Sequence, residues 1–158
     1  FQTHPETENR INYVKDLLIE KGIDIDRRAT TDYLKVNIKY IFEESFCTGT
    51  ISIDNIPIIN LSFPKSHEIY LKMIEATQNL DKFISIDLAP YEINVLVEGT
   101  TSTLLIRNNK IISLDDLETA FINKSSREVL RGTQDKIKQA LWEFKLKFPF
   151  DVKEDLED

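Results

Sequence analysis

Apolar residues follow a helical period near the start of the chain and an alternating period further on. Four of them share one face of a predicted N-terminal helix: Ile11, Val14, Leu17 and Leu18. Gly22 suits the end of this helix, because glycine tolerates the left-handed backbone that follows many helices. The pattern therefore predicts one amphipathic helix ahead of the first strand.

The segment from Leu34 to Phe42 alternates apolar and polar residues, which is typical of a half-buried strand. Leu34, Ile38 and Phe42, together with Ile41, could also share the face of a helix. The β-branched residues of the segment favour the strand, because they pack well on a pleated surface.

A hairpin is predicted over residues 46–53 and 56–63. Asp54 and Asn55 would close it, since both residue types tolerate the positive φ that two-residue turns require. Pro57 has no N–H to donate to a ladder, so its strand is predicted to lie at the edge of a sheet.

The middle of the chain predicts a second helix with four apolar residues on one face: Ile69, Met73, Ala76 and Leu80. Ser66 suits the N-cap of this helix. Alternation then predicts strands over residues 83–88, 91–97 and 103–107. Asn108 and Asn109 would turn the chain into a further strand at residues 111–112.

Helices are predicted to follow the last strand. Ser113 and Asp116 have the spacing of a capping box for a short helix. The final helix is predicted to break at Gly132, with Thr133 as a fresh N-cap. Five residues share its apolar face: Ile137, Ala140, Leu141, Phe144 and Phe148.

The order of these elements predicts an α+β fold. An antiparallel meander sheet would be covered on one face by the N-terminal helix, the middle helix and the long C-terminal helix. Residues 1–148 are predicted to form a single domain, because the 158-residue chain holds few glycines and prolines and no linker-like segment.

Charge divides the chain unevenly. Five acids and one lysine from Pro149 onward supply −4 of the formal net charge of −7, which leaves −3 for the first 148 residues. We therefore expect residues 149–158 to form an acidic C-terminal tail. The absence of a basic surface argues against a nucleic-acid partner. No apolar run approaches the roughly 18 residues that cross a bilayer.

Cys47 is the only cysteine, so no intrachain disulfide can form, and a reducing compartment such as the cytoplasm is favoured. Pairing of Cys47 with His67 would be the one route to a cysteine nucleophile, but a strand position is more typical of a buried structural thiol. The spacing of His4, His67 and the acids predicts no metal site. We expect no cofactor.

Glu143 and Lys145 have the acid-x-lysine spacing of metal-dependent nucleases. That chemistry would need a second acid, for which Asp87 is the best candidate, and would need residues 142–148 to form a strand. The alternative function is therefore a small metal-dependent hydrolase or nuclease.

Because no catalytic motif is complete, we expect a non-enzymatic protein-interaction domain, such as a subunit, an adaptor or a chaperone-like or immunity-like binder. Its partner would be another protein chain or a second copy in a homodimer. An edge strand could accept an extended peptide, and the last helix carries more aromatic bulk than one core-facing stripe needs. The predicted contact residues are Ile56, Pro57, Ile58, Trp142, Phe144 and Phe148. The order helix, three strands, helix, strands, helix resembles that of the dimeric secretion chaperones of pathogenic bacteria.

Overall fold

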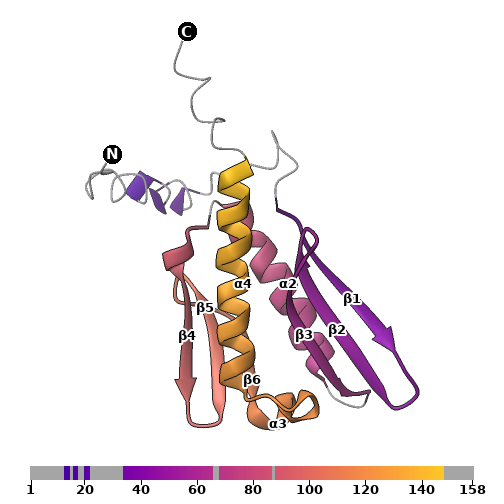
Figure 1. Cartoon of the computed structure of the whole chain (residues 1–158). Coiled ribbons are helices and arrows are strands. Elements are labelled where there is room, and N and C mark those ends of the chain that lie inside the picture. The colour runs from indigo at the N-terminus through magenta and orange to yellow at the C-terminus, as the bar shows by residue number, and fades with distance from the viewer. Residues whose placement is uncertain are drawn as a thin grey trace.

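Two antiparallel sheets and two long helices form the part of the chain that is described in the computed structural model (Figure 1). The described residues are 13, 14, 16, 17, 20, 21, 34–65, 68–86 and 88–147. The predicted N-terminal helix lies largely outside them, although Val14 and Leu17 are helical. The predicted acidic tail lies wholly outside them. The α+β class predicted from the sequence is confirmed.

The first sheet is a meander in the order β1-β2-β3, formed by Val36–Phe42, Phe46–Ile53 and Ile56–Pro64. Every second residue of β2 is buried, as alternation predicts for a strand with one face on a core. Asp54 has the positive φ expected at the turn between β2 and β3. The predicted strand at residues 34–42 and the predicted hairpin are therefore confirmed.

The second sheet is another meander, β4-β5-β6, formed by Ile93–Glu98, Thr101–Ile106 and Asn109–Asp115. A short 3-10 turn, η2 (Pro90–Glu92), precedes it. Each sheet contains one register shift that points consecutive isoleucines into the interior, Ile58 with Ile59 in β3 and Ile111 with Ile112 in β6. The predicted single meander is thus divided into two.

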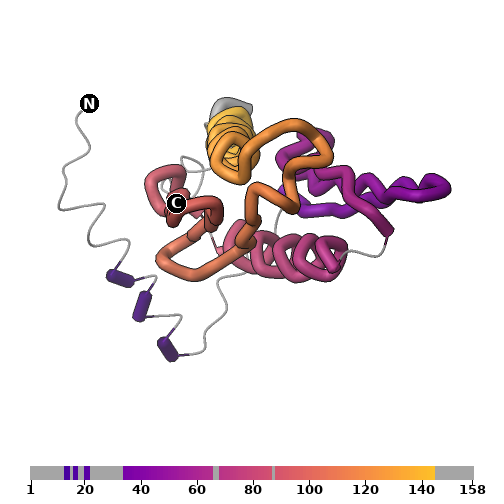
Figure 2. The backbone as a smooth tube through the Cα atoms, turned by 90° about the horizontal axis from the view of Figure 1, so that it is seen from below, coloured from indigo at the N-terminus to yellow at the C-terminus, as the bar shows by residue number. Residues whose placement is uncertain are grey.

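The helix α2 (Ile69–Ser85) packs on β1 and β2 and reaches β6, while α4 (Ser126–Lys147) packs on β3, β4 and β5. Seen from below, the two helices lie on opposite sides of the strand layer (Figure 2). Their buried residues and those of both sheets form one apolar core. The predicted packing of the long final helix on the sheet is confirmed.

The predicted strand at residues 83–88 is wrong, because α2 continues to Ser85. Leu80 and Ile84 extend the buried stripe of this helix by one more turn. The break predicted at Gly132 is also wrong. A Cβ at Gly132 would meet open space, and Thr133 donates its hydroxyl hydrogen bond to the Val129 carbonyl within a continuous α4.

Two turn predictions are wrong by a residue or two. The positive φ angles fall on Arg107 and Asn108, so the hairpin turns one residue earlier than predicted. The capping box of the short helix α3 (Asp116–Thr119) uses Asp115 and Glu118 instead of Ser113 and Asp116, because β6 runs to Asp115 and the helix begins directly after it. A second 3-10 turn, η3 (Ala120–Ile122), leads into α4.

Candidate functional site: the free edge of strand β1

The outer strand of the first sheet carries the most exposed pair of neighbouring apolar residues among the described strands. Ile41 is 63% exposed and Phe42 is 69% exposed. They project to opposite faces of β1, because successive side chains of a strand alternate. A contact along this edge would therefore cover apolar surface on both faces of the sheet.

Register shows which backbone groups of β1 point away from the sheet. Lys35 accepts a hydrogen bond from the Asp54 amide, and the Glu43 amide donates to Phe46, so the odd-numbered residues of β1 bond to β2. The even-numbered residues therefore direct their N–H and C=O groups outward. The Val36 amide confirms this parity, because it donates to the Asp81 carboxylate at 3.2 Å instead of to β2.

Ile38, Tyr40 and Phe42 are the remaining even-numbered residues of β1. No backbone group in the described residues pairs with their outward N–H and C=O groups. Both edges of this sheet are open in the described chain, with α4 and η3 packed on β3 and α2 packed on β1. The outward groups of β1 form one edge that a further strand could join.

The free edge is held by α2, which lies beneath it. The Tyr40 hydroxyl donates a 2.8 Å hydrogen bond to the Tyr70 carbonyl in the first turn of α2. The Tyr40 and Phe42 rings lie 6.1 Å apart, which is within aromatic contact. Burial, with smaller contributions from Cys47 and Tyr70, raises the pKa of Tyr40 to about 12, so its hydroxyl stays a donor at physiological pH.

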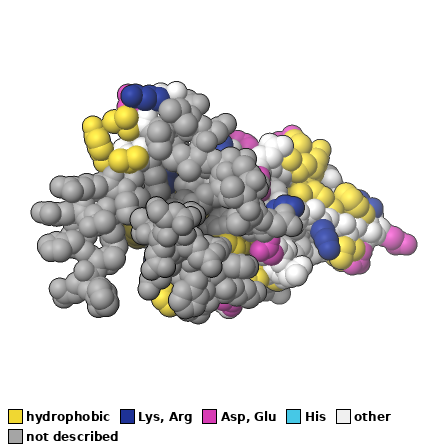
Figure 3. Space-filling model, turned by 90° about the horizontal axis from the view of Figure 1, so that it is seen from above, with side chains coloured by type: hydrophobic (Ala, Val, Ile, Leu, Met, Phe, Trp, Pro, Cys, Tyr) yellow, Lys and Arg dark blue, Asp and Glu magenta, His cyan; other side chains and the backbone are white. Residues whose placement is uncertain are grey.

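The surface seen from above carries hydrophobic side chains among charged ones on the side where the first sheet lies (Figure 3). Three aromatic residues lie at the β1 edge or beside it: Tyr40 and Phe42, whose rings are 6.1 Å apart, and Tyr70, whose carbonyl accepts from the Tyr40 hydroxyl. Tyr70 is 41% exposed on α2. We call these three residues the aromatic cluster.

The predicted contact residues on β3 lie in different environments. Pro57 is exposed and Ile56 is half-buried, and both lie on the edge strand that Pro57 predicted. Ile58 is only 2% exposed because the register shift turns it into the core. Among these three, Pro57 presents the most surface to a partner.

The predicted contact residues on α4 also differ in exposure. Trp142 is 60% exposed, whereas Phe144 packs partly buried against the core. Phe148 lies outside the described residues. The aromatic bulk that seemed excessive for one stripe therefore leaves one large exposed ring in the described part of α4. A single exposed apolar residue is common on protein surfaces.

The residues of the hydrolase alternative do not assemble into a described site. Glu143 lies in α4 and is bonded to Gln139, so the strand that the alternative requires at residues 142–148 is a helix as far as Lys147. The Lys145 side chain and Asp87 lie outside the described part. No cluster of three metal-ligating side chains occurs among the described residues.

The cysteine alternative lacks a reactive thiol. Cys47 is 2% exposed on the buried face of β2, and burial raises its pKa, which disfavours the nucleophilic thiolate. His67, its predicted partner, lies outside the described residues. Cys47 is therefore a core residue.

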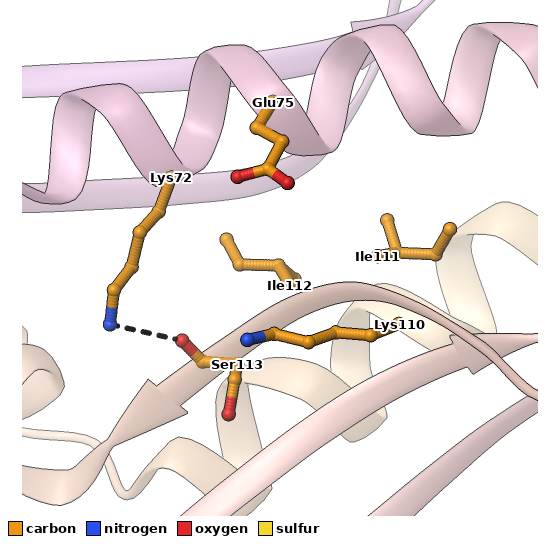
Figure 4. Close-up of a pocket in the computed structure, with 6 residues that line it drawn as sticks. All are labelled: Lys72, Glu75, Lys110, Ile111, Ile112 and Ser113. Carbon is orange, nitrogen blue, oxygen red and sulfur yellow. Dashed lines mark hydrogen bonds between the residues drawn. The ribbon is translucent and has the colours of Figure 1, made fainter.

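A small cleft lies between α2 and β6, with a volume of about 180 Å³ (Figure 4). Lys72 on its wall donates to the Ser113 carbonyl and pairs with Glu118 at 2.6 Å. Glu75 and Lys110 supply the other charges. Since Lys72 already has protein partners, the cleft gathers no set of free catalytic groups.

No helix in the described residues is long and apolar enough to cross a bilayer. Comparison with protein-family models, curated proteins and solved structures finds no match to this chain.

Proposed function

We propose that the chain is a non-enzymatic protein-interaction domain that receives an extended polypeptide segment at the edge of β1. One observation carries the proposal: at Phe42, outward backbone groups coincide with an exposed apolar side chain. Ile38 and Tyr40 present outward backbone groups as well, and their side chains are half-buried. An added strand would satisfy the first and cover the second.

The chemistry of the edge sets what such a segment would look like. On the α2 side its side chains would meet the aromatic cluster, so they would be apolar. On the opposite face they would meet Lys39 and Ile41, which alternate with the cluster along β1. Backbone hydrogen bonds would supply affinity that depends little on sequence, and the two faces would supply selectivity.

The proposal is tested by photocrosslinking from the edge. Phe42 is replaced by p-benzoylphenylalanine in the full chain, and the protein is irradiated in an extract of its source organism. The matched control carries the same group at Tyr91, an aromatic residue of η2 with a similar exposure of 60%.

We expect polypeptide adducts from position 42 in clear excess over those from position 91. Equal yields from the two positions, or no adduct from position 42, would overturn the proposal. Chance encounters depend mainly on exposure, and the two positions are nearly matched in it.

A further inference from the structure

We propose that the extended segment received by β1 belongs to a different protein and is selected by an apolar strip at the end of the first sheet. The strip consists of Ile41, Phe46, Phe121 and Leu117, and it continues from the β1 edge onto η3 and α3. The inference rests on the proposed function and names the surface that selects the segment. The two halves of the described chain share one plan, and the strip lies where they differ.

Each half is a unit of three antiparallel strands followed by a helix, β1-β2-β3-α2 and β4-β5-β6-α4. Each helix packs on the first two strands of its own unit and on the third strand of the other unit. The helix α2 thus packs on β1, β2 and β6, and α4 packs on β4, β5 and β3. Because the two units have matching surroundings, each one shows what the other needs in order to fold.

The units also agree in local detail. The turns after β2 and β5 both place a positive φ of 50° on their first residue, Asp54 or Arg107. The amide of that residue donates to the Lys35 carbonyl in the first unit and to the Glu92 carbonyl in the second, at 2.8 and 3.0 Å. The register shift described above buries two consecutive isoleucines in the third strand of each unit. The two units can therefore be aligned residue by residue.

The alignment ends at the first hairpin of each unit. In the second unit a two-residue turn closes the hairpin directly after Glu98 pairs with Thr101. Ile41 and Thr48 form the equivalent pair, the sixth along the ladder in both units, but the first hairpin continues through residues 42–47. The second unit in turn inserts α3 and η3 between β6 and α4. Each unit thus carries one addition that the other lacks.

The two additions lie at the same end of the molecule and touch each other. The tip of the β1–β2 hairpin and α3 both lie at the lower end in Figure 1. The Phe46 ring of the hairpin and the Phe121 ring of η3 have centroids 5.6 Å apart. Ile41 lies diagonal to Phe46 on the same face of the sheet, because Ile41 pairs with Thr48. Leu117 precedes Phe121 by about one helical turn, which completes the strip.

The strip exposes apolar surface that the shared plan does not require. Ile41 is 63% exposed, Phe121 52% and Leu117 87%, while Phe46 is half-buried between its neighbours. The other residues on this face of β2 are threonines and a serine, so the apolar surface is confined to the end of the sheet. The second unit folds without a hairpin extension, and exposed apolar residues that adjoin one another are typical of an interaction surface.

The strip is continuous with the β1 edge, because Ile41 belongs to both. A segment paired along β1 therefore reaches the strip where it passes the hairpin tip. Backbone groups beneath the strip are already paired within the first sheet and within α3 and η3, so contact there depends on side chains. The segment that fits carries bulky apolar residues at the end that passes the tip.

A second copy of β1 does not fit this requirement. Its residues on the face of Ile41 include Lys35, Asn37 and Lys39, which would approach the strip in an antiparallel pair. In a parallel pair the residues that pass the tip would be Glu43 and Glu44. Either arrangement would set polar side chains against apolar ones, so we expect the segment to come from a different protein.

Photocrosslinking from the strip tests the inference. In the full chain p-benzoylphenylalanine replaces Leu117, the most exposed residue of the strip, and the protein is irradiated in the same extract as the position-42 protein. The matched control carries the group at Leu96, an exposed apolar residue of β4, which is the outer strand of the second unit. Mass spectrometry of the adducts identifies the labelled polypeptide and the labelled stretch of its sequence.

We expect positions 42 and 117 to label one stretch of the same polypeptide, a stretch with bulky apolar residues, and position 96 to label it far less. The Leu117→Ser substitution should lower the adduct yield from position 42 by about 3- to 10-fold, because partial burial of one leucine contributes that much to affinity. Leu96→Ser is the control substitution and should leave that yield unchanged. Both substituted residues are exposed, so neither change should unfold the chain.

The outcomes separate this inference from the proposed function. Labelling from position 42 without labelling of the same polypeptide from position 117 would overturn the inference and leave the proposed function standing. Equal labelling from positions 96 and 117, an unchanged yield in Leu117→Ser, or adducts between two copies of the chain would do the same. No adduct from position 42 would overturn both.

Discussion

Replacement of Gly49 by alanine probes the packing that supports the free edge. Gly49 lies on the buried face of β2, paired with Tyr40 of β1. A Cβ at this position would lie 2.7 Å from Met73 Sδ, 2.9 Å from Met73 Cε and 2.9 Å from Tyr40 Cε1. Contacts this short are repulsive, so the Met73 or Tyr40 side chain must move to admit a methyl group.

The expected cost follows from how far these neighbours can move. Met73 is flexible but fully buried, and Tyr40 is tied by its hydroxyl to the Tyr70 carbonyl. Overpacking of a core by one methyl group costs about 1–3 kcal/mol, and alanine recovers about 0.4–1 kcal/mol by restricting the unfolded chain. We therefore expect a net loss of about 1–2 kcal/mol, or a fall in Tm of about 2–8 °C for a chain of this size.

Urea unfolding followed by circular dichroism measures the loss, and a double-mutant cycle with Met73→Ala identifies its cause. Met73→Ala removes both sulfur-end atoms that crowd Gly49, so Gly49→Ala should cost at least about 1 kcal/mol less in that background. An equal cost in both backgrounds would refute crowding by Met73 as the source of the loss. A stabilising effect of Gly49→Ala alone would refute it as well.

Three further substitutions or titrations test other parts of the structure. Ser126→Ala should lower the free energy of unfolding by about 1–3 kcal/mol, as measured by chemical denaturation. The buried Ser126 hydroxyl donates to Asp116 Oδ1 at 2.8 Å, and its loss leaves partners unsatisfied. Cys47 should react with a thiol reagent at pH 8 only as fast as the chain opens, since burial hides the thiol and raises its pKa, and a fast reaction in the native state would contradict the packing. Tyr40 should ionise near pH 12, as a late phase of an ultraviolet titration that Tyr40→Phe abolishes. Its raised pKa makes a contribution to stability that is fully present below pH 10 and is lost as the pH rises towards 12, so Tyr40→Phe should flatten that loss in alkaline unfolding curves.

Much of the first sheet could be predicted from the sequence because local pattern and turn chemistry agree there. Alternation identified residues 34–42 as a strand, and Asp54 with Asn55 identified the hairpin over residues 46–53 and 56–63. The prediction for the segment after Leu80 was wrong because a short apolar run fits both the helical and the strand period. The segment is helical as far as Ser85, since a helix buries Ile84 against the core. Local pattern also missed the capping box of α4, although Ser125 and Glu128 have its spacing.

The site was only partly predictable, since its openness depends on topology. Pro57 correctly indicated an edge strand, but the sequence does not say that α4 packs on that strand while α2 packs on β1. Ile58 looked available to a partner until the register shift turned it inward. Exposed residues of β1 such as Phe42 were read as members of a half-buried strand. Only the pairing of β1 with β2 shows which of these residues also direct their backbone N–H and C=O groups away from the sheet.

Two exposed apolar features compete for the role of contact surface, and directionality decides between them. Trp142 presents a large ring on α4, but helix backbone groups are bonded within the helix, so only side-chain contact could form there. The β1 edge presents apolar rings together with donors and acceptors at fixed spacing, and these select the direction and register of what binds. In the isolated fold, water can bond to the outward backbone groups, so the unpaired edge costs little free energy. Exposure of Ile41 and Phe42 to water is unfavourable and has no such compensation. Under the proposed function, the apolar side chains would favour association at the edge, and the backbone groups would set its geometry.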